Sequence, residues 1–361
     1  MQKAPKIQLR LSPEAEKYVR KDAPTGVRRL AAGGALPLPP VELVTVLFVL
    51  SHDSDAEVKS KANASLEGLP ESVCQTVMSS PDAHPAVLHA LCHIFKDSAS
   101  LTEALALNAA ADDQTFVFLA SLPHRRVVDI VANNQERMLR CDGIAEALGE
   151  NPLTGRATID RILSFLGIGK ARGEEVEEEV ESLDPSELTD SSAAEALRAF
   201  LGADAGEFAR ALIDDTDCEL SEEEEGNLFA LLQRMSVMQK IKLARLGNKE
   251  ARSLLVRDHN KLVAAAAIRS PKVTDNEIEG IAKARNVSDE VLRIIAANRE
   301  WTRNYSVKRA LATNPKCPIQ HAMKFLNFMQ EKDLRSVMRS KDVPAAISTH
   351  ARRLLQKKGR L

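Results

Sequence analysis

The sequence predicts an all-α protein built from short helices stacked in tandem, and three observations lead to this fold class. The 361 residues are 44% hydrophobic but only 4% aromatic, so Ala, Leu, Val and Ile carry most of the apolar content. Small apolar side chains of this kind suit thin, closely packed helices better than they suit β-strands. A short motif also recurs along the chain, and the expected helix starts follow one another at a regular spacing.

The recurring motif is a short apolar helix, then Asn-Pro or Ser-Pro, a few turn residues and another apolar helix. Proline lacks an N–H and disfavours helix in the residue before it, so each copy ends one helix. The motif prolines are Pro81, Pro152, Pro271 and Pro315, and a degenerate copy has Ala109 in their place. The residues seven and ten positions further on share one face of the next helix, which we expect to be buried. They are Leu88, Phe116, Ile159, Ile278 and Ala322, and Leu91, Leu119, Ile162, Ile281 and Phe325.

The expected helix starts are spaced by about 14 residues, which resembles the helix spacing within known helical repeats. In the first half they fall near residues 41, 55, 70, 83, 99, 112, 126, 141 and 154. In the second half they fall near residues 248, 260, 274, 288, 303, 317, 331 and 343. Three pairs have the capping-box pattern that begins a helix, namely Thr274 with Glu277, Ser54 with Glu57 and Ser221 with Glu224. The spacing leaves open whether the repeat unit is a helix pair or a helix triplet.

The charge distribution divides the chain further, because a net charge of −2 hides a strong internal polarity. Residues 174–225 contain 20 acidic and two basic residues, whereas residues 226–361 contain 28 basic and 11 acidic residues. We therefore predict an N-terminal cap with short helices at 1–40, near Pro13–Arg20 and Gly26–Ala32, and a first helical-repeat block at 41–168. An acidic, partly helical linker at 169–226 would join it to a basic repeat block at 227–361.

The motif sequences ATNPKCP and ENPLTGRATI, with SHDSDAEVKSKANASLEGLP at residues 51–70, resemble bacterial HEAT-like and leucine-rich-repeat-variant helical repeats. The resemblance covers roughly residues 41–166 and 248–357. It implies an α-solenoid of the HEAT, armadillo or leucine-rich-repeat-variant kind in a bacterial protein. It carries little information about activity, since such arrays serve as scaffolds, regulators and a few enzymes.

Cysteine usage and hydropathy predict a cytoplasmic protein. The five cysteines, Cys74, Cys92, Cys141, Cys218 and Cys317, lie far apart without a CxxC pair, as is usual in a reducing compartment. The N-terminus lacks the apolar core of a signal peptide. No apolar run approaches the ~20 residues that span a bilayer.

The strongest candidate for metal binding is the group His84, His89, Cys92 and His93, with Cys74 nearby. His89 and His93 are four residues apart, which is a ligand spacing on a helix. However, Cys92 follows the buried face as a small hydrophobic residue, so we predict no metal site. The sequence also lacks GxSxG, a P-loop and a glycine fingerprint. We therefore predict a non-enzymatic protein with no catalytic residue and no cofactor.

A basic cluster with interleaved aromatic residues is a candidate contact surface for anions or nucleic acid. It consists of Arg293, Arg299, Trp301, Arg303, Tyr305, Lys308 and Arg309. The alternative interpretation is that these cations solvate the outer faces of helices, while the two aromatic side chains fill a seam between helices.

The function predicted from the sequence is protein binding or scaffolding, because stacked helices form extended concave surfaces. The alternative is nucleic-acid association through the basic block, with the acidic linker as an intramolecular shield. The identity of the protein partner and the oligomeric state stay open.

Overall fold

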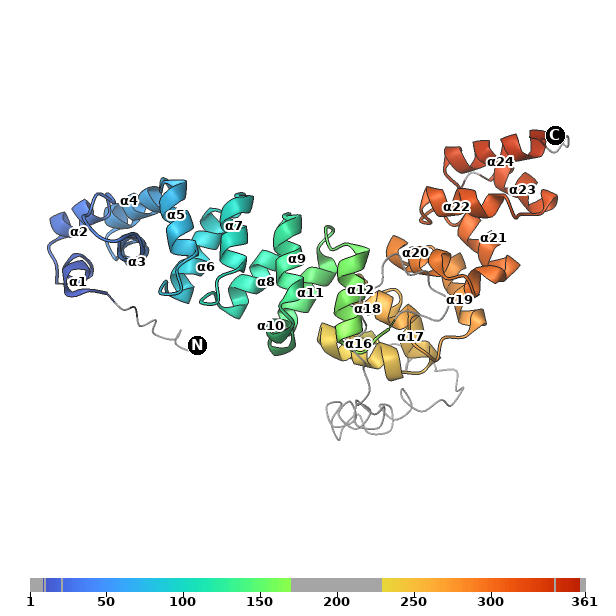
Figure 1. Cartoon of the computed structure of the whole chain (residues 1–361), viewed down its shortest axis with the longest axis horizontal. Helices are drawn as coiled ribbons and strands as arrows, with labels where there is room; N and C mark the ends of the chain where they lie inside the picture. The colour runs from blue at the N-terminus through green and yellow to red at the C-terminus, as the bar shows by residue number, and fades with distance from the viewer. Residues whose placement is uncertain (1–8, 10, 21, 170–228, 341, 358–361) are drawn as a thin grey trace. The chain divides into compact units, whose positions relative to one another are not determined.

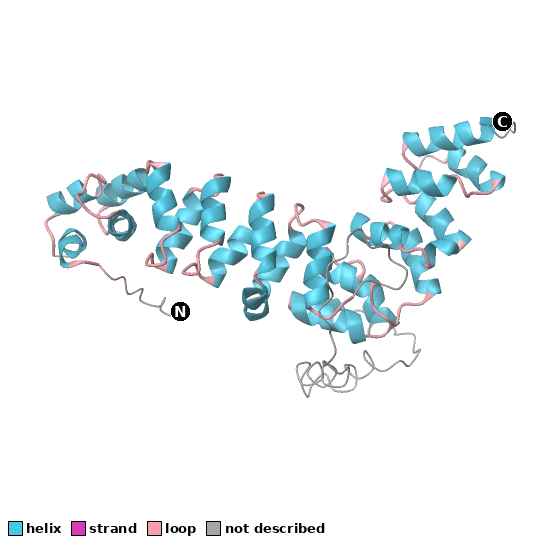
Figure 2. Cartoon of the chain, viewed as in Figure 1, coloured by secondary structure: helices cyan, strands magenta, loops and turns pink. Residues whose placement is uncertain are grey.

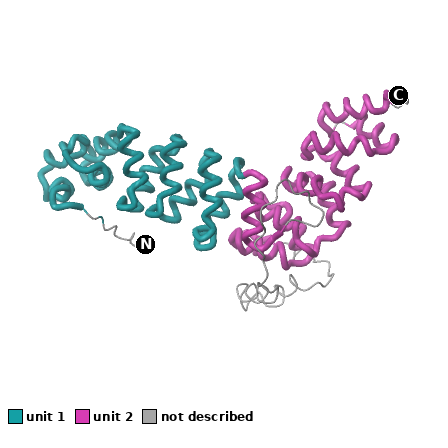
Figure 3. The backbone as a smooth tube through the Cα atoms, in the orientation of Figure 1, with its two compact units in different colours: residues 1–154 teal, residues 155–361 magenta. Residues whose placement is uncertain are grey.

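The computed structural model describes residues 9–169 and 229–357, except residues 10, 21 and 341. All regular structure in this part of the chain is helical, and it contains no β-strand (Figure 2). The predicted all-α fold class is therefore confirmed. The predicted linker at 169–226, including the Ser221–Glu224 capping box, lies almost entirely outside the described residues. The chain divides into two compact units, residues 1–154 and residues 155–361 (Figure 3).

The first unit consists of short helices, each packed against helices one to three places away along the chain (Figure 1). They are α1 (Pro13–Val19), α2 (Thr25–Ala31), α3 (Pro40–Leu50), α4 (Ala56–Glu67), α5 (Glu71–Met78), α6 (Pro85–Ile94), α7 (Ala99–Ala106), α8 (Asp113–Ser121), α9 (Arg125–Asn133), α10 (Gln135–Arg140) and α11 (Asp142–Glu150). The core of α1–α4 is made largely of alanine and valine, so these helices approach one another closely.

The second unit repeats this packing of near neighbours. Its helices are α12 (Arg156–Phe165), α16 (Val237–Leu246), α17 (Lys249–Leu255), α18 (Lys261–Ile268), α19 (Asp275–Lys283), α20 (Asp289–Ala297), the 3-10 helix η2 (Trp301–Arg303), α21 (Tyr305–Thr313), α22 (Ile319–Leu326), α23 (Glu331–Arg339) and α24 (Ala345–Lys357). Helix α18 lies at the centre of the second unit, because every residue from Leu262 to Ile268 is buried.

Helix α12 belongs to the second unit, although the sequence analysis placed residues 41–168 together in the first block. The helix packs against α18, from which it is separated by about a quarter of the chain. An ion pair of 2.5 Å joins Arg269 Nη2 at the end of α18 to Asp160 Oδ1 on α12, and the Arg269 side chain is only 1% exposed. Helix α12 therefore belongs to the same compact unit as α16–α24, although a long stretch of sequence separates it from them.

The predicted helix starts lie within two residues of the observed starts throughout the chain. Thr274 caps α19 as expected, accepting the Glu277 N–H and donating to its carboxylate. At α4 the capping residue is Asp55 and not Ser54. Helices α10 and α16 were not predicted, although Ser236 and Gln239 form a complete capping box at the start of α16.

The predicted buried face is also observed, with one exception. Nine of the ten residues placed seven and ten positions after the motif are buried. The exception is Ile281, which is partly exposed, whereas the next residue, Ala282, is fully buried. The prediction that Ile281 lies in the core is therefore wrong. Its side chain lines a groove, described below.

The motif asparagines form a hydrogen-bond pattern that recurs in both units. Each Nδ2 donates to two backbone carbonyls 28 to 32 residues earlier in the chain, and each Oδ1 accepts a backbone N–H two residues later. The residues are Asn108 (Met78 and Ser80 carbonyls), Asn151 (Ala120 and Leu122) and Asn314 (Ala282 and Ala284). The degenerate copy with Ala109 keeps its asparagine, so the asparagine rather than the proline carries the contact between neighbouring repeats.

We expect Asn314→Ala to lower the free energy of unfolding by about 2–3 kcal/mol, because two carbonyls, one of them buried, lose their donor. The lost bonds are those of 2.9 Å to the Ala282 and Ala284 carbonyls. Asn314→Ser should retain part of this stability, since Ser270 in the equivalent position donates to the Arg245 carbonyl at 3.2 Å. Urea unfolding followed by circular dichroism measures both changes.

The matched control is Asn327→Ala, which changes an exposed asparagine at the end of α22. It should alter the free energy of unfolding by less than about 0.5 kcal/mol. An equal effect of Asn314→Ala and Asn327→Ala would show that the buried amide adds no stability to the stack.

Candidate binding groove

A groove on the second unit is lined by residues of α17 and α19 and by the turns beside them. Its volume is about 710 Å³. Its apolar lining includes Val256, Ile281, Ala284 and Val287. Ile281 and Ala284 are partly exposed, so the groove offers apolar surface that is accessible to a ligand.

The wall of the groove is held by a buried ion pair between α17 and α19. Arg252 Nη2 and Nε lie 2.8 and 3.1 Å from the two carboxylate oxygens of Glu277, and Nη1 donates to the Gly247 carbonyl at 2.8 Å. The side chains of Arg252 and Glu277 are 5% and 7% exposed. This bidentate ion pair fixes both side chains and neutralises both charges inside the wall of the groove.

The rim of the groove is basic once the Arg252–Glu277 pair is set aside. Lys249, Arg257 and Lys272 line it with exposed side chains, and Glu250 is the one other carboxylate that the described residues contribute to the lining. The exposed side chains of Lys249 and Arg257 beside an apolar floor favour a positive local potential among the described residues of the rim. Such a surface attracts acidic ligands.

Gly280 leaves the groove open. It lies inside α19, where glycine is about 1 kcal/mol less favourable than alanine. Among the described residues, no atom beyond its immediate helical surroundings lies within 4 Å of the position a Cβ would take. Close packing therefore gives no reason for a glycine here. What the missing side chain provides is space along the wall of the groove.

The basic cluster predicted from the sequence lies elsewhere in the second unit, and several of its members contact other residues of the chain. Arg293 pairs with Asp289 and Glu290 on its own helix, at 3.4 and 3.2 Å. The ammonium group of Lys308 lies 5.2 Å from the centre of the Phe328 ring.

Two further members of the cluster meet at one carboxylate. The Tyr305 hydroxyl donates to Asp333 and accepts the Gln330 N–H, and Arg309 lies 3.8 Å from Asp333. Arg299 precedes η2 and Arg303 ends it; both are exposed, and Trp301 is partly exposed. The structure thus joins Tyr305 to Arg309 through Asp333 and leaves Arg293 on α20, with its own carboxylate partners.

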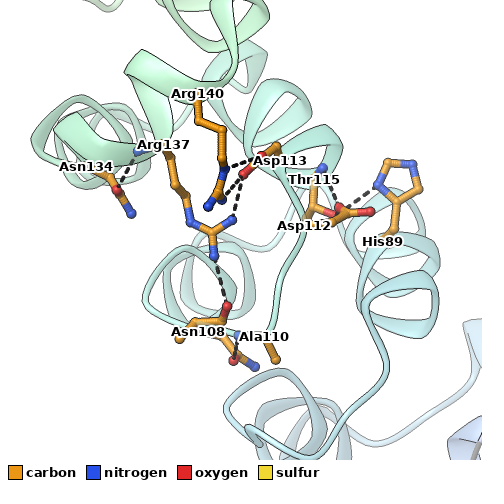
Figure 4. Close-up of polar contacts among 10 residues, drawn as sticks. His89, Asn108, Ala110, Asp112, Asp113, Thr115, Asn134, Arg137 and Arg140 are labelled. Carbon is orange, nitrogen blue, oxygen red and sulfur yellow. Dashed lines mark hydrogen bonds and ion pairs between the residues drawn. The ribbon is translucent and has the colours of Figure 1, made fainter.

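A second concentration of charged side chains lies in the first unit, where α10 meets α8 (Figure 4). Asp113 accepts from Arg137 Nη1 at 3.0 Å and from Arg140 at 2.6 and 2.8 Å. The hydrogen bond from Arg140 is the largest of the effects that lower the pKa of Asp113. Arg137 also covers the Phe116 ring at 4.2 Å and donates to the Ala109 carbonyl. These contacts anchor α10, so their role is structural.

The histidine–cysteine group around α6 does not converge on one point. Cys74 and Cys92 are buried, and burial raises the pKa of Cys92 to about 12. His84 caps α6 by accepting the Ala86 N–H. No cluster of three or more histidine, cysteine or acidic side chains in the described residues has the geometry of a metal site.

Comparison with protein-family models, with curated proteins and with solved structures finds no match to this chain. Within the described parts of the sequence, no helix is long and apolar enough to cross a membrane.

Proposed function

We propose that the second unit is a non-enzymatic binding module that takes an acidic, partly apolar peptide segment of a protein partner into the groove of α17 and α19. The observation that carries this proposal is the combination of a basic rim with accessible apolar lining at Ile281 and Ala284. Alternating acidic and apolar side chains of a bound segment would meet both surfaces at once.

The tandem packing supports the same class of function. Apart from α12 on α18, the described helices pack mainly against near neighbours in the chain, and the asparagine bonds recur at repeat spacing. We infer from this that both units are α-solenoid blocks, which offer extended surfaces for recognition or scaffolding in the cytoplasm.

We expect the full chain to bind a fluorescently labelled peptide in which glutamate and leucine alternate, measured by fluorescence anisotropy. Lys249→Glu combined with Arg257→Glu should weaken this binding by about tenfold or more, because the rim becomes acidic. Gly280→Phe should also weaken it, since the new side chain occupies the groove without meeting a packed neighbour. Affinity should fall as salt rises.

The matched control is Lys324→Glu, which changes the charge of an exposed lysine on α22, outside the groove. This variant should leave the affinity unchanged. A peptide in which lysine replaces glutamate should not bind the natural chain. Equal binding by Gly280→Phe and the natural chain, or equal loss in Lys324→Glu, would contradict the proposed site.

The nucleic-acid alternative has no comparable support. Arg293, Lys308 and Arg309 each contact another side chain of this unit. The acidic segment that would act as a shield lies outside the described residues. Double-stranded DNA therefore serves as a competitor in the same binding assay.

A further inference from the structure

His89 and His93 lie one turn apart on α6 and bring two ring nitrogens together. Their Nε2 atoms are 3.2 Å apart, and the ring centres are 4.6 Å apart in an edge-on arrangement. Two nitrogens that each bind a tetrahedral Zn²⁺ at 2.0–2.1 Å are separated by about 3.3 Å. The observed separation therefore matches that of two ligands on one metal ion.

The orientation of His89 is fixed by a buried threonine (Figure 4). Thr115 Oγ1 donates its only proton to Asp112 Oδ1 at 2.5 Å, and the Thr115 backbone N–H reaches the same oxygen at 2.8 Å. The contact of 3.0 Å between Thr115 Oγ1 and His89 Nδ1 must then be a bond donated by Nδ1–H. In neutral His89 the lone pair is consequently on Nε2, which faces His93.

His93 is held in place from the other side. Its ring packs on Phe118 with centres 3.8 Å apart, while the residue stays exposed to solvent. Burial of part of the ring, together with the nearby His89 and Lys96, lowers the pKa of His93. Only the neutral form of an imidazole can bind a metal ion.

We propose that His89 and His93 form a binding site for a divalent transition-metal ion of the Zn²⁺ or Ni²⁺ kind, with both Nε2 atoms as ligands. In the metal-free pair the Nε2–H of His93 donates to His89, and in the metal-bound pair the His93 proton is on Nδ1. Water fills the other coordination positions, because the neighbouring thiol of Cys92 is fully buried. With two protein ligands the site binds more weakly than a four-ligand structural zinc site.

The test is isothermal titration of Zn²⁺ or Ni²⁺ into the full chain, freed of metal and kept reduced. We expect one site that needs both imidazoles, so His93→Asn should weaken binding by about tenfold or more. His350→Asn is the control, since it removes a histidine on α24 in the second unit. The absence of binding up to about 1 mM metal, or equal affinity of His93→Asn and the natural chain, would overturn the site.

Thr115 supplies a second, independent test, because it positions His89 without touching the metal. Thr115→Val should weaken metal binding by about tenfold, as is usual when the orienting partner of a histidine ligand is lost. Thr115→Ser keeps the hydroxyl and should restore the affinity. If the serine variant binds as weakly as the valine variant, the hydroxyl does not orient His89.

Discussion

Phe325→Ala should lower the free energy of unfolding by about 3–5 kcal/mol, because truncation of a buried phenylalanine removes apolar contacts and leaves a cavity. The residue is 4% exposed and lies on α22. Helix α22 packs against α21 and α24, so the damage should stay near α21–α24. Hydrogen–deuterium exchange with mass spectrometry should show lost protection there, with α3–α9 still protected.

Ile281→Ala is the matched comparison, because both residues occupy the same position of the repeat motif. Ile281 is partly exposed in the groove, so its truncation should change the free energy of unfolding by less than about 1.5 kcal/mol. A loss as large as that of Phe325→Ala would mean that Ile281 is a core residue and that the groove is not open in solution.

The sequence was sufficient to predict where most helices begin, because the signals are local. Proline, asparagine and aspartate at helix ends act within a few residues. Helix α10 escaped prediction because a single residue, Asn134, is both the C-cap of α9 and the N-cap of α10, with φ −87° and ψ 75°. Neither proline nor glycine marks that junction.

The groove could not be read from the sequence, because its parts are brought together only by the packing of α17 against α19. From the sequence alone Arg252 looks like an arginine on the protein surface. In the structure its side chain is buried and paired with Glu277. Gly280 is the one local signal that was available. A glycine inside the helical stretch NEIEGIAK, with no turn to form, indicates a need for space.

The role of the motif asparagines was hidden for a similar reason. Asn151 and Asn314 precede prolines, which by themselves explain the end of a helix. Asn108 precedes Ala109 and bonds in the same way, so the asparagine is needed for the carbonyls of the preceding repeat. These hydrogen bonds join residues about 30 positions apart. The neighbouring sequence therefore does not indicate them, except through the recurrence of the asparagine.

Arg252→Met should destabilise the second unit by about 3–5 kcal/mol, because it leaves Glu277 charged in the groove wall without its cation. The guanidinium makes two contacts with that carboxylate and one with the Gly247 carbonyl, so three bonds are lost together. A second change, Glu277→Gln, should recover most of the loss, since it removes the unpaired charge and keeps a side chain of the same size. Urea unfolding of the two single variants and the double variant measures the coupling between them.

An exposed ion pair on the same helix provides the control. Lys283 and Glu279 are one turn apart on α19, and their side chains are 54% and 26% exposed. Water screens this pair, so Lys283→Met should change the free energy of unfolding by less than about 0.5 kcal/mol. If Arg252→Met is equally mild, the wall is hydrated and α17 does not depend on Glu277. If the double variant is no more stable than Arg252→Met, the loss comes from the packing of the arginine side chain and not from an unpaired carboxylate.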